Sequence, residues 1–314
     1  MKSTNSKNII ENIDIGGPTS VRSAAKNFIR VASLCRVTDY SRVIEELKDT
    51  GGKISYETRR DLMRIAFNVT ADYEAAIAQK MDELAQKKSI RLHFSQGKEL
   101  RYGENSHQKA SFYKQQGASH SLFDLHQVHG KELSYNNVMD IEASIEGVSS
   151  LEGSGCCIVK HNNPCGLAQS SCQKEAFLRS WQGDSVSAFG SVMAFNQPVE
   201  KDTVSCFCWD HKDPSQRKFI EVIVAPSFTK DALEVLQTKK NIRLIQYDMN
   251  SSTDRQNLKI FRGSLLSQDS DKQLGLNYDW VTTETNAHLS KELLAFGLHG
   301  VRSIKSNAIV IANE

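Results

Sequence analysis

Lys160 and His161 stand side by side where an apolar run, residues 156–159, meets a turn-forming segment, residues 162–166. Adjacent side chains on a regular strand point to opposite faces, so one ligand can meet both only if the strand ends near them. Proline at position 164 favours such an end, because it restricts the residue before it. An ammonium and an imidazole delivered to one point suit general acid–base catalysis. A strand end with two solvated polar residues explains the same pattern, and the pattern alone favours that simpler interpretation.

A second candidate group lies in the polar, glycine-containing loop of residues 100–108, which follows a short apolar stretch. Arg101 stands next to Tyr102 in this loop. A guanidinium group can bind two oxygens at once, which suits a phosphate or a carboxylate. As an isolated signal the pair is weak.

Two further positions stand out in apolar surroundings. Glu221 interrupts the apolar run of residues 219–226, which is expected to be a central strand. A carboxylate there needs a partner, either a ligand or a neighbouring backbone group. Gly190 lies among small residues between two apolar runs in residues 184–195, where the backbone is expected to approach a ligand or another strand closely.

Asp14 and Lys26 are the candidate chemical groups near the N-terminus. They belong to a predicted unit in which a strand end and glycine turn at residues 13–18 lead to a helix over residues 20–29 and a strand over residues 31–35. One such unit cannot close a core by itself. A helix-capping carboxylate and a surface lysine explain the two residues equally simply, and spacing alone favours that interpretation.

The pattern of residues 38–88 is helical. We expect Asp39 to cap a helix that ends near Lys48, Ser55 and Thr58 to precede a second helix, and a third to span residues 71–87. The domain boundary is placed after Lys88, which gives domains of residues 1–88 and 89–314.

The second domain should alternate strands and helices, which predicts an α/β fold. Residues 199–218 and 251–279 look like surface excursions. The remaining expected elements are helices beginning near Asp140 and over residues 173–181, 231–238 and 290–298, and strands over residues 156–159, 219–226, 241–246 and 301–312. The sequence stops while the pattern is still strand-like, which favours a truncated chain.

Composition narrows the class of protein. The 39 Lys and Arg against 37 Asp and Glu give no imbalance that points to nucleic acid or to a membrane surface. No apolar run approaches the roughly 18 residues of a membrane-spanning helix, and no signal-peptide core is present, so a cytoplasmic protein is expected. The seven cysteines are odd in number and should be reduced. None has zinc-knuckle spacing, and Pro164-Cys165 lacks the second cysteine and the H-x-E of zinc deaminases, so no zinc is expected.

Taken in order, eight segments resemble the bifunctional purine-biosynthesis enzymes that join aminoimidazole-carboxamide ribonucleotide formyltransferase to inosine-monophosphate cyclohydrolase, in their bacterial form. The matching segments are IDIGGP, AAKN, LRYGENSHQ, KELSYNN, VKHNNPCG, SAFG, EVIVAP and KSNAIV. The resemblance implies the end of a methylglyoxal-synthase-like cyclohydrolase domain with connecting helices, followed by an incomplete, zinc-free, cytidine-deaminase-like formyltransferase domain. So many collinear motifs argue strongly against an unrelated α/β nucleotide-binding module.

The resemblance also implies roles for single residues. His161 would assist proton removal from the attacking 5-amino group, and Lys160 would steady charge in the transition state. In KSNAIV, Asn307 would orient the carboxamide and formyl groups. The nucleotide would be held by Arg101, Tyr102, the Gly190 backbone and Glu221, the last of these near the ribose. For the cyclohydrolase, Asp14 and Lys26 would be an acid–base pair.

The sequence departs from the family pattern in several places. Relative to the family, the chain looks truncated at both ends. Phe28 replaces a histidine beside Lys26, Ser191 replaces the second glycine of the SAFGG loop, and residues 204–218 expand a short segment. These departures suggest relaxed constraint.

The resemblance therefore implies a formyltransferase with a residual cyclohydrolase region, acting in de novo purine synthesis. The co-substrate would be 10-formyltetrahydrofolate, and the resemblance leaves room for a structural potassium ion. Partners would be the nucleotide substrate and a second copy in a homodimer, or chains that supply missing parts. The alternative is an inactive fragment that binds nucleotide or a partner chain.

Overall fold

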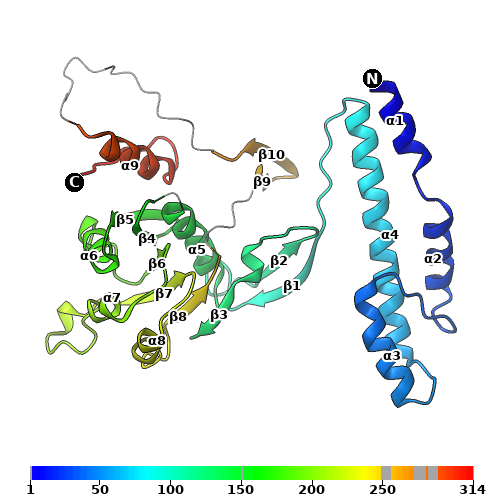
Figure 1. Ribbon diagram of the computed structural model, residues 1–314, viewed down its shortest axis with the longest axis horizontal. Helices are drawn as coiled ribbons and strands as arrows, with labels where there is room; N and C mark the ends of the chain where they lie inside the picture. The colour runs from blue at the N-terminus through cyan, green and yellow to red at the C-terminus, as the bar shows by residue number, and fades with distance from the viewer. Residues whose placement is uncertain (1, 150, 249–255, 272–280, 282–288, 314) are drawn as a thin grey trace. The chain divides into compact units, whose positions relative to one another are not determined.

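The structure is a computed structural model that describes the chain apart from residues 1, 150, 249–255, 272–280, 282–288 and 314, and only the backbone of residues 2–6. It divides into two compact units, Met1–His93 and Phe94–Glu314 (Figure 1). The division falls close to residue 88, where the composition changes from helical to strand-rich segments.

The described residues of the first unit form helices joined by turns and irregular segments, with no strand. It contains α1 (Lys2–Glu11), α2 (Gly16–Lys26), a 3-10 turn (Val37–Asp39), α3 (Tyr40–Asp49) and α4 (Tyr56–Leu84). The strands predicted near residue 13 and over residues 31–35 are wrong, because strand backbone groups need a neighbouring strand and the described unit offers none. The break predicted before residue 71 is also wrong, because α4 contains neither glycine nor proline.

The helices of this unit are joined by an apolar seam. Ala25 of α2 and Leu62, Ile65 and Ala66 of α4 are buried, and α2 packs along α4. Ser55 begins α4 as predicted, because its hydroxyl accepts a hydrogen bond from the Thr58 amide at 3.2 Å.

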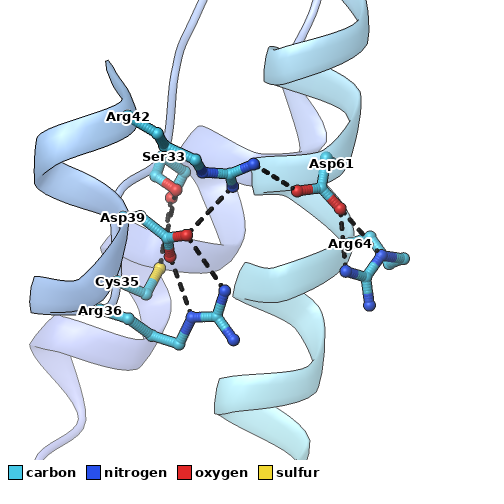
Figure 2. Close-up of polar contacts among 7 residues, drawn as sticks. All are labelled: Ser33, Cys35, Arg36, Asp39, Arg42, Asp61 and Arg64. Carbon is cyan, nitrogen blue, oxygen red and sulfur yellow. Dashed lines mark hydrogen bonds and ion pairs between the residues drawn. The ribbon is translucent and has the colours of Figure 1, made fainter. Parts of the chain in front are cut away.

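Asp39 occupies the N-cap position of α3, as predicted, but its side chain makes no capping hydrogen bond. Its carboxylate lies against two guanidinium groups, at 2.9 Å from Nε of Arg36 and 3.1 Å from Nη2 of Arg42. Figure 2 shows that Arg42 also reaches Asp61 on α4, at 2.9 Å, and that Asp61 pairs with Arg64. Only 5% of the Asp39 side chain is exposed, so its charge needs these partners. The network ties the segment before α3 to α3 itself and to α4.

The Asp39 network should make the helical unit sensitive to acid. The hydrogen bond from Arg36 holds the pKa of Asp39 below its usual range, and Arg64 does the same for Asp61. A lowered folded-state pKa adds stability above the unfolded value, about 3.9, and that stability is lost as pH falls through the folded pKa. At pH 7, Asp39→Asn should lower the hydrogen-exchange protection factors of α3 by about 10- to 100-fold, and the difference from wild type should shrink toward pH 3.

The control for this prediction is Asp49→Asn, at the exposed end of α3, which makes no ion pair within the described residues. It should leave α3 protection nearly unchanged at each pH. A wild-type/Asp39→Asn difference that stays constant from pH 7 to pH 3 would contradict a charge-dependent role for Asp39.

The second unit is built on a six-stranded mixed sheet of order β3-β8-β7-β6-β4-β5. Strands β6, β7 and β8 are parallel, while β4 runs antiparallel to β5 and β6, and β3 antiparallel to β8. The strands are β3 (His126–His129), β4 (Ser154–Lys160), β5 (Asn163–Ser170), β6 (Ser191–Phe195), β7 (Ile220–Ala225) and β8 (Arg243–Gln246). Two separate hairpins pair β1 (Phe94–Leu100) with β2 (Ala110–Gln115) and β9 (Gln256–Phe261) with β10 (Ser264–Asp269).

Helices cover both faces of this sheet, which confirms an α/β architecture (Figure 1). One face packs against α5 (Tyr135–Val148) and α9 (Lys291–Arg302), and the other against α6 (Gln173–Gly183), α7 (Lys201–Ser205) and α8 (Lys230–Leu236). Helix α5 begins earlier than the predicted Asp140, because Ser134 and Asn137 form a reciprocal capping box. No helix in the described part of the chain is both long and apolar enough to cross a membrane.

The segment over residues 199–218 is not the surface excursion that was predicted. Val204 and Phe207 are buried in the core, and the Phe207 ring lies edge-on to Phe177 with centroids 4.9 Å apart. The prediction was wrong because most residues of this segment are polar, so its average polarity did not reveal the two apolar residues that are buried.

Two further predictions need correction. The strand expected over residues 301–312 is absent, because α9 continues to Arg302 and the following residues form neither helix nor strand. Ile309 and Ile311 are at least 90% exposed there, without the neighbouring strand that their alternation would need. The irregular stretch expected over residues 251–279 contains the β9–β10 hairpin, and its remainder lies largely outside the described residues.

Candidate active site

The strand that carries Lys160 ends at that residue, as predicted. Lys160 is the last residue of β4, and His161 and Asn162 form a two-residue turn with φ of +55° and +63°. Positive φ at both central residues is typical of a tight hairpin whose twist matches its strands. The turn is shorter than predicted, because Asn163 already begins β5. Pro164 is tolerated in β5 because β5 is an edge strand of the sheet.

Sheet topology brings several predicted residues to one end of the strands. Because β4 is antiparallel to β6, its end lies beside the beginning of β6, where Val159 pairs with Val192. The parallel strands β7 and β8 begin at the same edge, with Val222 opposite Arg243. We call this end of the sheet the corner. It comprises Lys160, His161, Gly190, Glu221, Arg243 and the loop of Arg101 and Tyr102.

The loop before β6 wraps round the Lys160 ammonium. Lys160 Nζ donates a hydrogen bond to the Phe189 carbonyl at 2.5 Å. Gly190 has φ of +72°, and a Cβ placed there would lie 3.3 Å from the Phe219 ring and 4.0 Å from Lys160 Nζ. Glycine therefore serves both the left-handed backbone and the close approach, and only the close approach was predicted from the small-residue pattern. Beside it, the buried hydroxyl of Ser191 has no hydrogen-bond partner within the described residues.

Glu221 is directed into the corner by an irregularity in the sheet. Ser191 pairs with Ile220 and Val192 with Val222, so Glu221 is the extra residue of a bulge. Its carboxylate lies 3.4 Å from Asn137 Nδ2 and 3.6 Å from Arg243 Nη1. The carboxylate does have partners, but they are two side chains rather than the ligand or backbone group that was predicted. Bulges next to functional sites commonly re-aim a side chain in this way.

Arg243 was missed in the sequence. It is 4% exposed, and its Nε donates a hydrogen bond to the Glu132 carbonyl at 3.1 Å. Burial lowers the pKa of its guanidinium, Glu221 opposes that change, and the nearby Arg101 adds to it. The available signal was an arginine inside the apolar run of residues 241–246, a pattern like the one that singled out Glu221.

The Arg101 loop adds unpaired positive charge. Backbone hydrogen bonds of 3.0 Å, from Arg101 to Leu133 and from Tyr135 to Tyr102, fix the loop against the start of α5. The Arg101 guanidinium lies 5.2 Å from the centre of the Tyr102 ring and is exposed. Within the described residues Arg101 makes no ion pair, while Arg243 shares a single carboxylate, Glu221. The corner therefore has an excess of positive charge suited to an anion such as phosphate.

Asp140 is a second residue that the sequence did not reveal. From α5, its carboxylate accepts a hydrogen bond from the Asn162 amide of the turn at 2.7 Å. Burial raises the pKa of this carboxyl group, while the hydrogen bond from Asn162 and the charge of His161 oppose the rise. No motif marked it, because its partners come from a hairpin about twenty residues further along the chain.

Asn307 is the predicted site residue of the second unit that no described contact brings to the corner. Asn307 is exposed and makes no hydrogen bond or ion pair with another described residue. Asp14 and Lys26 lie in the helical unit at opposite ends of α2, about 15 Å apart along its axis. The Asp14 carboxylate accepts the Gly17 amide at 3.1 Å, which is a capping contact. The α2 geometry therefore does not make Asp14 and Lys26 a directly interacting pair.

Metal ligation and cysteine chemistry find little support at the corner. Among the described residues, no group of three or more His, Cys, Asp or Glu side chains is arranged to hold a metal ion. All seven cysteines are free thiols. Burial raises the pKa of Cys156 to about 12 and that of Cys165 to about 11, which disfavours the thiolate form needed for nucleophilic attack.

The fold and the corner define an α/β protein with a cationic site at one edge of a mixed sheet. A family model described as AICARFT/IMPCHase bienzyme matches residues 24–314, and the chain belongs to this family. It is 37% identical over 305 residues to the bifunctional purine biosynthesis protein PurH of Clostridium botulinum, and 39% identical to the proteins of that name from Fusobacterium nucleatum and Elusimicrobium minutum. These alignments cover 97–98% of this chain and 58–59% of the relatives, so the chain spans less than two thirds of their length.

Proposed function

We propose that the Phe94–Glu314 unit transfers a formyl group from 10-formyltetrahydrofolate to the 5-amino group of aminoimidazole-carboxamide ribonucleotide, in the synthesis of inosine monophosphate. The observation that supports this proposal is the hairpin turn that presents Lys160 and His161 at the same end of the sheet as the positive charges of Arg101 and Arg243. This end of the sheet thereby offers positive charge for an anionic nucleotide and a proton acceptor for the attacking amine.

In the proposed reaction, the amine nitrogen attacks the formyl carbon and forms the new C–N bond. His161 takes the proton that the amine loses, because an amine conjugated to an imidazole carboxamide is a poor nucleophile. Lys160 stabilises the negative charge on the formyl oxygen. The bond from the formyl carbon to the folate nitrogen then breaks, that nitrogen gains a proton, and tetrahydrofolate leaves.

The remaining residues would bind and orient the nucleotide. Arg101 and Tyr102 would hold its phosphate end, and Glu221 would face the ribose hydroxyls. The Gly190 backbone would contact the base. Asn307 would orient the carboxamide, which requires the segment after α9 to approach the corner.

We further propose the finer assignments that accompany this function. Residues 1–88 would belong to a methylglyoxal-synthase-like cyclohydrolase part, with Asp14 and Lys26 as its remaining site residues, and residues 89–314 to a cytidine-deaminase-like part that needs no zinc. The protein would act in the cytoplasm as a homodimer. A structural potassium ion stays a secondary proposal.

An alternative function is nucleotide binding without turnover. It is favoured by the exposed Asn307, which makes no described contact with the corner. Both functions use the same cationic corner and differ in whether His161 performs chemistry.

The experiment that separates the two functions follows tetrahydrofolate formation from 10-formyltetrahydrofolate and the ribonucleotide, together with nucleotide binding by calorimetry. Arg101→Ala should weaken nucleotide binding by about 10- to 100-fold, because hydrogen bonds to a charged group contribute about 1.5–3 kcal/mol. Arg179→Ala, a surface arginine paired with Glu175 on α6, is the matched control and should bind normally.

Turnover by the wild-type chain would support the formyltransferase. Binding that depends on Arg101, without turnover, would support the alternative. Binding unaffected by Arg101→Ala would contradict the phosphate assignment, and absence of both binding and turnover would sink both functions.

A further inference from the structure

Asp140 lies where helix α5 meets the turn that presents His161. The helix packs on the face of the sheet that includes β4, through Ile141, Ile145 and Val148. Asp140 precedes this apolar stripe, is half-buried, and extends its carboxylate to the hairpin turn. Asp140 is thus a charged residue on a packed helix, and its carboxylate reaches the backbone of the turn that carries His161.

A carboxylate outside the hairpin adds support to the backbone of the turn. His161 and Asn162 both have left-handed φ values, which side chains other than glycine adopt uncommonly. The Asp140 carboxylate accepts the Asn162 amide at 2.7 Å and also interacts with the backbone amide of His161. Charge-assisted hydrogen bonds of this kind are stronger than those between neutral groups.

The His161 imidazole has no other anchor. Its side chain is exposed and makes no hydrogen bond within the described residues. The backbone from which the ring projects therefore sets the direction of its Cα–Cβ bond. The same carboxylate that holds this backbone also interacts electrostatically with the ring.

We propose that Asp140 is the positioning residue of His161. Its carboxylate holds the two-residue turn in the left-handed conformation that directs the imidazole into the corner, and its negative charge stabilises the imidazolium formed when His161 accepts a proton. The catalytic part of this inference rests on the proposed formyl transfer. The positioning part concerns the turn itself and can be tested without turnover.

The test compares Asp140→Ala with Asp140→Asn in the full chain. The alanine variant loses the acceptor, so the Asn162 amide should exchange with solvent about 10- to 100-fold faster, and the ring resonances of His161 should shift. The asparagine variant keeps an acceptor oxygen but loses the charge, so it should retain slow exchange at Asn162. Amides of the central strand β7 serve as the internal reference for global stability.

In the formyl-transfer assay, Asp140→Ala should lower kcat by about 100-fold, because misplacing a catalytic group by about 1 Å costs that much. KM for the nucleotide should change less than threefold, because the Arg101 loop is untouched. Asp140→Asn should recover part of kcat and thereby separate the charge from the hydrogen bond. Asp213→Ala is the matched control: Asp213 also accepts a backbone amide, that of Ser215 at 2.9 Å, but within residues 199–218.

Unchanged Asn162 exchange and unchanged His161 resonances in Asp140→Ala would overturn the positioning role. Faster exchange with an unaltered kcat would reduce Asp140 to a purely structural contact and overturn its link to catalysis. If the wild-type chain does not transfer formyl groups, the proposed function fails, and the exchange and resonance data still decide whether Asp140 positions His161. If Asp140→Ala does not fold, Asp140→Asn decides the question. Loss of slow Asn162 exchange in Asp140→Asn would count against the proposal, whereas slow exchange together with shifted His161 resonances would support it.

Discussion

Replacing His161 by alanine should lower kcat for formyl transfer by about 10²- to 10⁴-fold, the usual contribution of a positioned general base. His161 follows Lys160 directly in the sequence. Its imidazole projects from a turn whose backbone is held by the hydrogen bond from the Asn162 amide to Asp140. Nucleotide affinity should change little, because Arg101 and Arg243 supply the positive charge. The measurement is steady-state tetrahydrofolate formation, with nucleotide binding determined on the same samples.

His211→Ala is the control for this substitution. His211 is also exposed, but it lies in the segment before β7 and its Nδ1 contacts only the backbone near Asp213. Its removal should leave kcat within about twofold of wild type. Full activity in His161→Ala would show that another group takes the proton and would remove the central support for the proposed mechanism.

Replacing Phe207 by alanine should destabilise the Phe94–Glu314 unit by about 3–5 kcal/mol, the range for truncating a buried aromatic side chain. The ring is fully buried and contacts Phe177 and Trp209 at centroid distances of 4.9 and 5.3 Å. Its removal leaves a cavity between the sheet and α6 that the surrounding strands cannot fill. Urea unfolding followed by the fluorescence of Trp181 and Trp209 reports this change directly, because both rings belong to the same aromatic cluster.

Phe261→Ala provides the comparison, because Phe261 is 49% exposed on the β9–β10 hairpin. It should cost less than about 1 kcal/mol. Equal effects of the two substitutions would mean that residues 199–218 do not anchor the core. In that case the segment would have to be regarded as the surface excursion that its composition suggested.

Residues that break a local pattern could be recognised in advance. Glu221 stood out because a carboxylate in an apolar strand requires a partner, and Gly190 because small residues between apolar runs permit close backbone approach. Arg243 carried a comparable signal within a shorter run. In each case the residue type was unfavourable in the element predicted for it, and the local sequence was enough to show this.

Residues whose role depends on distant partners could not be recognised. Asp140 is an ordinary helical aspartate until the β4–β5 hairpin is folded over it. Asp39 looked like a helix cap, and its partners Arg36 and Arg42 are only three residues away. What the sequence did not show is the burial of its carboxylate, which comes from packing within the helical unit. The strand predicted over residues 31–35 failed for a related reason, since β structure depends on a pairing partner that no local pattern specifies.

The sequence by itself determined the family, the alternation of helices and strands in the second unit, and the identity of the Lys160-His161 pair, because each is encoded in residue order and periodicity. The tertiary structure alone decided which groups lie around that pair. A bulge turns Glu221 toward Asn137 and Arg243, antiparallel pairing brings the end of β4 to the start of β6, and a carboxylate from α5 holds the turn. These are long-range contacts, and their geometry exists only once sheet register and helix packing are set.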